Sequence, residues 1–317
     1  MNDEPLVSIC IPAYKHADLV ARCLDSIQLQ NFKNFEVIIT DDSVDNSIEK
    51  IIPLYSTSLN IFYYKNQAAL GSPKNWNYAI TKAKGKYIKI MHQDDWFATD
   101  QALQKFVESL EKNPDAVFAF SSCQNIIGTT KQPVRKNLEK YVEKIKLNPY
   151  YLILDNVIRT PSTGIFRNNI GLLYDEKMKW CVDYDFYIRL LSVYKNFVWI
   201  EDVLINIGLH ENQITNTVIA DASVVVFENI RLLNKIDLSK INVIIYYDFF
   251  WRMMRNFKIR SLNQLNDLTT DEKIPLFMLQ IVYAQKKIPS AVLKNGFCSK
   301  IIMFICYCTN KLKELFR

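Results

Sequence analysis

Residues 6–43, LVSICIPAYKHADLVARCLDSIQLQNFKNFEVIITDDS, alternate between the two periodicities of regular secondary structure. The short apolar runs at 6–11 and 35–40 have the length and composition of buried strands. Between them, apolar side chains recur at helical spacing, and Asp18 is placed to cap the helix at its N-terminus. A strand, a helix and a second strand in this order predict a βαβ unit with parallel strands.

The same alternation continues to residue 122. Further strand-like runs and helical segments follow at 60–64, 86–91 and 116–121, and at 45–55, 73–84 and 100–112, respectively. Asp100 is the expected N-cap of the last of these helices. The sequence therefore predicts an α/β fold with a Rossmann-like, mainly parallel sheet flanked by helices.

The rest of the chain is organised differently. Residues 160–169, TPSTGIFRNN, are rich in turn-forming residues, and residues 180–191 have the pattern of a helix with two acids near its start. From residue 222 the periodicity is mainly helical. We expect one domain over 1–214, with a change in character at 122/123, and a helical C-terminal region over 215–317.

Composition excludes several classes of protein. With 49% hydrophobic and 23% charged residues, the 317-residue chain is an ordinary folded protein rather than a disordered one. The net charge of +6 is spread along the chain without a basic cluster, so no nucleic-acid partner is expected. Seven cysteines without a CxxC pair, and three histidines, indicate a reducing compartment and no zinc site.

The two ends of the chain bear on its location. The acidic N-terminus does not resemble a signal peptide, and the apolar run 301–308 is too short to span a bilayer. A cytoplasmic protein is expected. The basic tail 286–317 leaves two alternatives, an amphipathic segment on the inner surface of the cell membrane or a basic helix packed on the domain over 1–214.

Acidic pairs follow two of the predicted strands. Asp41 and Asp42 come after the run 35–40, and Asp94 and Asp95 end the segment KIMHQDDWF at 89–97. Ligands of open α/β sheets bind beyond the carboxyl ends of the strands, so these ends and residues 12–14 should meet. A single acidic pair is usually a turn or a helix cap. Two pairs at equivalent strand ends favour a site for a divalent cation and an anionic ligand.

Four ordered motifs resemble glycosyltransferase family 2, which has the GT-A fold and includes bacterial surface-polysaccharide enzymes. The opening VSICIPAYK, with TDDS at 40–43, resembles the first strand and the acidic turn of the family. NQAALGSPKNWNYAITKAKGKYI at 66–88 resembles a second family segment, HQDDW at 92–96 occupies the DXD position, and VDYDFYIRL at 182–190 resembles the segment with the catalytic base. The resemblance covers about residues 5–214.

The resemblance implies an inverting transfer of a sugar from a nucleotide diphosphate sugar, most often a UDP-sugar, to a hydroxyl of a glycan or lipid-linked glycan. Residues 1–122 would form the nucleotide-binding half of the catalytic domain and 123–214 the acceptor-binding half. The charge on the departing diphosphate calls for Mn²⁺ or Mg²⁺ at a carboxylate site, and the acceptor hydroxyl needs a base.

The resemblance also assigns roles to single residues. Asp183 would be the base and Asp95 the main metal ligand, with His210 as a second candidate for the metal site. The nucleotide would contact Pro12, Ala13, Tyr14, Asp42, Lys74 and Asp94. Donor or acceptor binding is implied for Thr163 and Gly164, and Trp96 is either a wall of the site or a stacking platform for a sugar.

Three departures from the family pattern leave a rival interpretation open. His92 stands where many members have an acid, Val182 replaces one acid of the base motif, and Lys74 replaces an arginine that could hold a phosphate bidentately. A non-catalytic nucleotide-sugar-binding or assembly module with the same fold is therefore the alternative to an enzyme.

Overall fold

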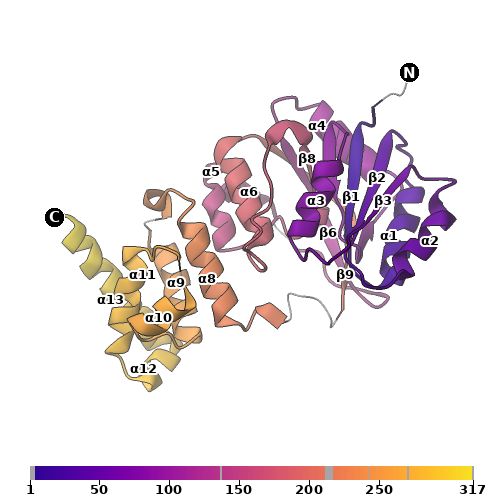
Figure 1. Cartoon of the computed structure of the whole chain (residues 1–317). Helices are drawn as coiled ribbons and strands as arrows, with labels where there is room; N and C mark the ends of the chain where they lie inside the picture. The colour runs from indigo at the N-terminus through magenta and orange to yellow at the C-terminus, as the bar shows by residue number, and fades with distance from the viewer. Residues whose placement is uncertain (1–3, 136–137, 211–216, 242, 270, 316–317) are drawn as a thin grey trace. The chain divides into compact units, whose positions relative to one another are not determined.

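The structure, a computed structural model, describes residues 4–135, 138–210, 217–241, 243–269 and 271–315. The chain divides into two compact units, Met1–Gln213 and Ile214–Arg317. The first unit contains the sheet and the second is helical (Figure 1).

The first half of the first unit is the predicted βαβ series. β1 (Val7–Ala13), β2 (Phe35–Asp41), β3 (Ile61–Lys65) and β4 (Tyr87–Ile90) pair in parallel in the order β3-β2-β1-β4. The connecting helices are α1 (Ala17–Gln28), α2 (Ser47–Tyr55), α3 (Lys74–Lys82) and α4 (Ala102–Glu111). These strands and helices confirm the α/β prediction.

The second half of the sheet is mixed rather than parallel. β8 (Gly164–Arg167) lies between β4 and β6 (Phe118–Ile127) and is antiparallel to both. β9 (Phe197–Leu209) is parallel to β6, the short β5 (Asp95–Phe97) is antiparallel to β9, and β7 (Thr130–Lys131) pairs with β6. Within the turn-rich segment 160–169, the sequence did not predict a strand, and the structure places β8 there between two other strands.

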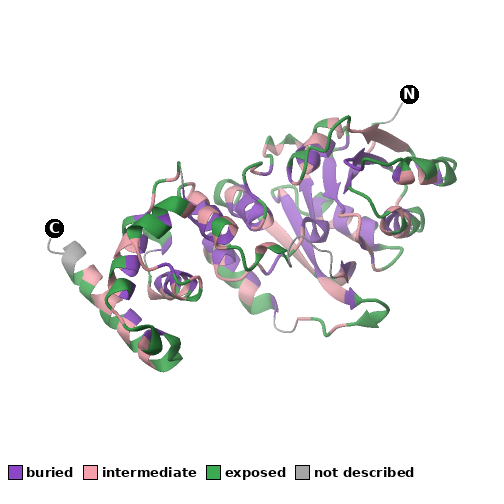
Figure 2. Ribbon diagram, turned by 60° about the horizontal axis from the view of Figure 1, so that its bottom comes forward, coloured by how far each residue is buried: buried purple, intermediate pink, exposed green. Residues whose placement is uncertain are grey.

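Alternating side chains of the central strands face different helices. Val7, Ile9 and Ile11 of β1 join the buried cluster that includes residues of α1 and α4. On the other face, the Cys10 Sγ lies 3.6 Å from the carbonyl oxygen of Ala79 in α3. Figure 2 shows buried residues along the strands and exposed residues on the outer sides of the helices. The strands are covered on both faces, as parallel strands require.

Both predicted helix caps were wrong. α1 begins after His16, and Lys15 and His16 have φ values of 55° and 53°, so the chain turns into the helix before Asp18. α4 begins after Gln101, and the Asp100 carboxylate instead accepts a hydrogen bond of 3.1 Å from the Asn31 side chain.

The remaining elements of the first unit are short, apart from two helices. α5 (Leu138–Leu147) and α6 (Val182–Val193) are the helices, and α6 confirms the helix predicted at 180–191. The three short 3₁₀ helices are η1 (Pro149–Ile153), η2 (Pro161–Thr163) and η3 (Asn168–Ile170).

The second unit has its own core. Its helices are α8 (Ala222–Leu233), α9 (Ile244–Asn256), α10 (Leu262–Leu268), α11 (Leu276–Lys286), α12 (Ser290–Lys294) and α13 (Gly296–Leu315), with η4 at Leu238–Ile241. The fully buried Trp251 of α9 donates its indole N–H to Ser299 of α13 at 3.0 Å. Across the described ranges, no helix has both the length and the apolar character needed to cross a membrane.

Candidate active site

The ends of β1, β2 and β4 meet, as their positions in the sequence predicted. The backbone N–H of Asp42 donates to the carbonyl of Ala13 at 2.9 Å. The side-chain amide of Gln93, just after β4, holds the backbone of Tyr14 through two hydrogen bonds of 2.7 and 3.0 Å. Pro12 and Ala13 are buried, whereas Tyr14 is 48% exposed, so only Tyr14 of the three offers its side chain to a base.

The acids that follow β2 are occupied by protein donors. The Asp42 carboxylate accepts bonds of 2.7, 3.0 and 2.8 Å from the Asn66 side chain and from the backbone N–H groups of Leu70 and Gly71. It therefore holds the segment before α3 in place, and the predicted bond from a pyrimidine would be an additional one. At the start of α3, Lys74 is exposed, while its buried neighbour Asn75 donates to the carbonyl of Thr40 at 2.9 Å.

The segment after β4 forms a compact group of potential metal ligands. One ligand atom from each of His92, Asp94 and Asp95 lies within 4.8 Å of the other two. The Nε2 of His210, at the end of β9, is 3.1 Å from an Asp94 oxygen. The predicted residues Asp94, Asp95 and His210 are thus brought together, and His92 joins them.

Burial makes this group electrostatically unusual. The pKa of Asp95 is raised well above its ordinary value, first by burial and second by the nearby Asp94 charge. Burial also lowers the pKa of His92, and it lowers the pKa of Lys89, fully buried in β4, to about 7. A carboxylate in such a place is stabilised by a cation.

The donor set fits a divalent cation. The Nε2 of His92 is buried and makes no hydrogen bond to any described group, while its Nδ1 lies 3.2 Å from the Thr160 hydroxyl. A neutral imidazole held in place by the Thr160 hydroxyl, together with two carboxylates, is a set of ligands that Mn²⁺ accepts more readily than Mg²⁺ does. His92, the departure from the family pattern, therefore remains compatible with a metal.

Close packing fixes the backbone of this group. A Cβ at Gly208 would lie 2.4 Å from the Asp94 carbonyl oxygen, so the approach of β9 to β5 requires a glycine. Arg22 of α1 donates to the same carbonyl at 2.8 Å, and its guanidinium lies 3.9 Å from the centre of the Trp96 ring. One face of Trp96 is thereby covered, which favours its role as a wall of the site.

The loop from Asn156 to Thr163 connects the acids to the helix of the predicted base. Thr160 contacts an Asp95 oxygen at 3.4 Å, and the Ser162 hydroxyl accepts the His92 backbone N–H at 2.9 Å. Thr163 is fully buried, with its hydroxyl bonded to the carbonyls of Ile158 and Thr160, and Gly164 packs against Phe118. Both residues support the loop in this structure, and their part in donor or acceptor binding stays a prediction.

Asp183 and Asp185 lie in the first turn of α6 but differ in their surroundings. Asp183 is partly exposed, and the side-chain amide of Asn156 donates to its Oδ2 at 2.7 Å. Asp185 is fully buried and forms a 2.7 Å ion pair with Arg189 one turn later. Asp185 is therefore a structural acid, while Asp183 can reach a ligand.

Several residues of the site were not identified from the sequence. Gln93, Asn156, Thr160 and Ser162 act through bonds between segments far apart in the chain, so no local pattern marks them. Lys89 had a usable signal, because a lysine in a strand covered on both faces must be buried.

Comparisons with known proteins agree with this geometry. The family model described as "Glycosyl transferase family 2" matches residues 8–172. An uncharacterized glycosyltransferase of Rickettsia typhi is 30% identical over 223 residues, which cover 68% of this chain and 67% of that protein.

Solved structures with the same fold extend over nearly all of the chain. S. aureus TarS (1-349), in complex with UDP-GlcNAc, has a TM-score of 0.62 at 16% identity, covering 98% of this chain and 92% of that one. The mannosyltransferase PcManGT from Pyrobaculum calidifontis, in complex with GDP-Man and Mn²⁺, has a TM-score of 0.50 at 14% identity, covering 96% and 74%. The chain belongs to glycosyl transferase family 2 and is a glycosyltransferase with the GT-A fold.

Proposed function

We propose that this protein transfers a sugar, with inversion, from a UDP-sugar to a hydroxyl of a glycan or lipid-linked glycan during the assembly of a surface polysaccharide. Asp183 is the base, and His92, Asp94 and Asp95 would hold a divalent cation that would supply positive charge for the diphosphate. His210 supports Asp94 or completes the set of ligands. Tyr14 stacks on the base of the nucleotide, with Lys74 near the nucleotide.

One observation carries this proposal: a single short loop bonds both to the proposed base, Asp183, and to the proposed metal ligands His92 and Asp95. Asn156 donates to Asp183 at 2.7 Å, and four residues later Thr160 contacts His92 and Asp95 at 3.2 and 3.4 Å. The group that takes the acceptor proton and the group that holds the leaving diphosphate are therefore held in a fixed relation, as a displacement at one carbon requires.

The proposed reaction is a displacement at the anomeric carbon of the donor sugar. Asp183 takes the proton of the acceptor hydroxyl, the oxygen forms a bond to the anomeric carbon, and the bond from that carbon to the diphosphate breaks with its electron pair on the diphosphate. A bound divalent cation supplies positive charge at the departing diphosphate. Arg22 and Gly208 keep the backbone of Asp94 in the position that this arrangement needs.

The choice of donor and cation rests on similar proteins and on the ligand set. TarS was solved with UDP and with UDP-GlcNAc, and PcManGT with GDP-Man and Mn²⁺. The imidazole of His92 favours Mn²⁺ over Mg²⁺. We therefore propose a UDP-sugar and Mn²⁺.

The test measures nucleotide release from a panel of UDP-sugars, with GDP-mannose as the comparison, in the presence of Mn²⁺. We expect UDP release by the wild type and a loss of about 10²–10⁴-fold in Asp183→Asn, the range for removal of a general base. Asp202→Asn, an exposed acid paired with Lys105, is the matched control and should keep full activity.

Two outcomes would contradict the proposal. Equal release by the wild type and Asp183→Asn would remove Asp183 from the role of base. UDP binding by both proteins, without release from any donor by either one, would favour the non-catalytic nucleotide-sugar-binding module.

We also propose that α13 lies against the cytoplasmic surface of the membrane. Exposed apolar side chains recur along one side of this helix at Phe297, Ile301, Phe304, Ile305 and Leu312. Lys294 and Lys300 are exposed close to them, and the opposite side of α13 packs within its own unit through Met303. The seven cysteines are all free, which supports a reducing compartment.

Vesicle sedimentation tests this contact. The full chain should bind phosphatidylglycerol vesicles more strongly than phosphatidylcholine vesicles, and Phe304→Ser with Ile305→Ser should abolish binding. Leu54→Ser, an exposed apolar residue of α2, is the control. Equal sedimentation of the double variant and the wild type would contradict a role for α13.

A further inference from the structure

The turn from Asn156 to Arg159 has an unusual backbone beside the proposed base. Arg159 has a φ of 77°, in the left-handed region that side chains other than glycine and asparagine rarely adopt. The Asn156 side chain holds both backbone groups of Arg159, accepting from its N–H at 3.1 Å and donating to its carbonyl at 3.2 Å. The same amide nitrogen donates to Asp183 at 2.7 Å. One asparagine therefore fixes the base and the strained arginine together.

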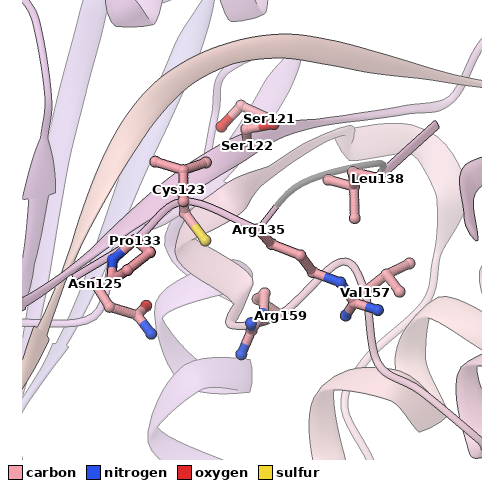
Figure 3. A pocket seen from close by; sticks show the side chains of 10 residues that line it. Ser121, Ser122, Cys123, Asn125, Pro133, Arg135, Leu138, Val157 and Arg159 are labelled. Atoms are coloured by element: carbon pink, nitrogen blue, oxygen red, sulfur yellow. The ribbon is translucent and has the colours of Figure 1, made fainter.

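Arg159 lines a small pocket in the acceptor half of the unit. The lining also includes Ser121 and Cys123 of β6, Arg135, Leu138 and Val157. Figure 3 shows the side chains of Arg135, Arg159 and Cys123 around this pocket. Three separate segments within residues 121–159 thus contribute to it, and two of them bring an arginine.

The two arginines differ in their charge balance. Arg135 is neutralised by Asp155 through two hydrogen bonds of 3.0 and 2.5 Å, and it lies over the ring of Tyr141 at 4.2 Å. Arg159 is exposed, and among the described residues its guanidinium has no hydrogen bond or ion pair. The pocket therefore carries an uncompensated positive charge, presented by a backbone conformation that costs stability.

We propose that Arg159 binds an anionic group of the acceptor, a phosphate or a carboxylate, and so directs a nearby acceptor hydroxyl to Asp183. A guanidinium matches both groups through paired N–H donors. The strained turn then has a physical purpose, because it places the Arg159 side chain in the lining of the pocket. Asn156, which bonds to both Arg159 and Asp183, keeps the proposed base at a fixed position relative to this arginine. This inference rests on the proposed function, since it names the class of acceptor for the same site.

The test measures binding of small anionic probes by NMR titration of the full-length protein. The probes are methyl β-D-glucuronide and glycerol phosphate, with methyl β-D-glucoside and glycerol as their uncharged counterparts. We expect the anionic probes to bind more tightly than the uncharged ones, and Arg159→Asn to weaken anion binding at least about tenfold. Asparagine tolerates the left-handed backbone, so this variant removes the charge and preserves the turn.

Two further variants separate charge from structure. Arg159→Lys keeps the charge and should retain part of the anion binding, whereas Arg252→Gln, an exposed arginine in the other unit, should leave it unchanged. Binding of only the phosphate or only the glucuronide would support the proposal and identify the source of the anion. Equal binding of anionic and uncharged probes, or unchanged anion binding in Arg159→Asn, would overturn it.

The readout distinguishes this inference from the proposed function. Probe binding requires neither a donor nor turnover, so it can fail while the wild type releases UDP, which would leave an enzyme with an uncharged acceptor. Conversely, loss of UDP release in Asp183→Asn tests only the base, whatever the charge of the acceptor.

Discussion

The acidic pairs near the carboxyl ends of β2 and β4, Asp41 with Asp42 and Asp94 with Asp95, are alike in sequence and different in chemistry. Asp41 accepts bonds of 2.7, 2.7 and 3.0 Å from the Ser43 N–H, the Tyr63 hydroxyl and Lys65, and Asp42 accepts three more. The Gly208 N–H and the Thr160 hydroxyl lie 3.3 and 3.4 Å from Asp95 oxygens and the Ser162 hydroxyl also bonds to this carboxyl, yet burial raises its pKa. The first pair is balanced by protein donors, whereas the second is balanced best by a cation.

Each pair also has a lysine, and the two lysines differ in the same way. Lys65 is partly exposed and forms a direct ion pair of 3.0 Å with Asp41. Lys89 is fully buried in β4, and its ammonium donates to the Ser162 carbonyl. Asp41, Asp42 and Asp95 are all buried, so the two pairs differ in their supply of protein donors rather than in exposure. The first pair serves to hold loops, whereas the buried Asp95 and Lys89 are kept at a cost that calls for a functional explanation.

The largest effect should come from Asp95→Asn. Removing the buried carboxylate should lower the rate of UDP release about a thousandfold, because charge stabilisation at the leaving group is lost. This change corresponds to about 4 kcal/mol in the activation free energy. The free energy of unfolding should stay equal or rise, since the variant no longer buries a charge. Activity assays with Mn²⁺, together with urea unfolding, check both statements. A large loss of stability would mean that Asp95, like Asp41, mainly holds the surrounding segments in place.

Lys89→Met should change how stability depends on pH. Burial lowers the pKa of Lys89 to about 7, whereas the unfolded chain holds this proton up to about pH 10.4. Between these values the unfolded state binds more protons, so Lys89 makes the free energy of unfolding rise with pH by about 1.4 kcal/mol per unit. Below pH 7 its contribution is constant.

Urea unfolding of wild type and Lys89→Met at pH 7, 8 and 9 measures this difference. The wild type should gain stability relative to the variant at each step, and Lys65→Met, which removes the partly exposed lysine of the first pair, is the matched control. A constant difference between wild type and Lys89→Met across this range would mean that Lys89 is charged in both states.

Mn²⁺ should stabilise the protein through the second pair only. At a concentration 100 times its dissociation constant, a ligand of the folded state adds about 2.7 kcal/mol to the free energy of unfolding. We expect this gain in the wild type and in Asp41→Asn, and its loss in Asp95→Asn. Thermal unfolding with and without Mn²⁺ measures it, and Ca²⁺ serves as a control for non-specific effects. An equal gain in the free energy of unfolding in Asp95→Asn would mean that Mn²⁺ binds at another site.

Periodicity predicted the first half of the fold well because the signal is local there. Each strand from 6–11 to 86–91 and each intervening helix lies within a few residues of its prediction. The sheet beyond β4 could not be predicted in this way. β8 has only the short run from Gly164 to Arg167 and is recognisable by its two partners rather than by its length.

The site shows the same division. Asp94, Asp95 and Asp183 could be identified from motifs, and the strand-end rule brought the first two together with Tyr14. The motifs could not separate Asp42 from Asp95, because the donors that occupy Asp42 come from residues 66–71 across a loop. Asn156 likewise acts across 27 residues of chain, so a three-dimensional structure was needed to connect it to Asp183.

The smallest effect should come from Asp41→Asn, and it should appear in stability rather than in chemistry. The new amide group would present a donor to Tyr63 and Lys65, which are donors themselves, inside a buried site. Leaving such groups unpaired costs about 1–3 kcal/mol. Asp115→Asn, an exposed acid before β6, should change stability by less than about 0.5 kcal/mol. Urea unfolding of both variants measures the difference, and UDP release per folded molecule should remain close to that of the wild type. A loss of activity without a loss of stability would reverse the assignment, since the pair after β2 would then act on the ligand as the pair after β4 does.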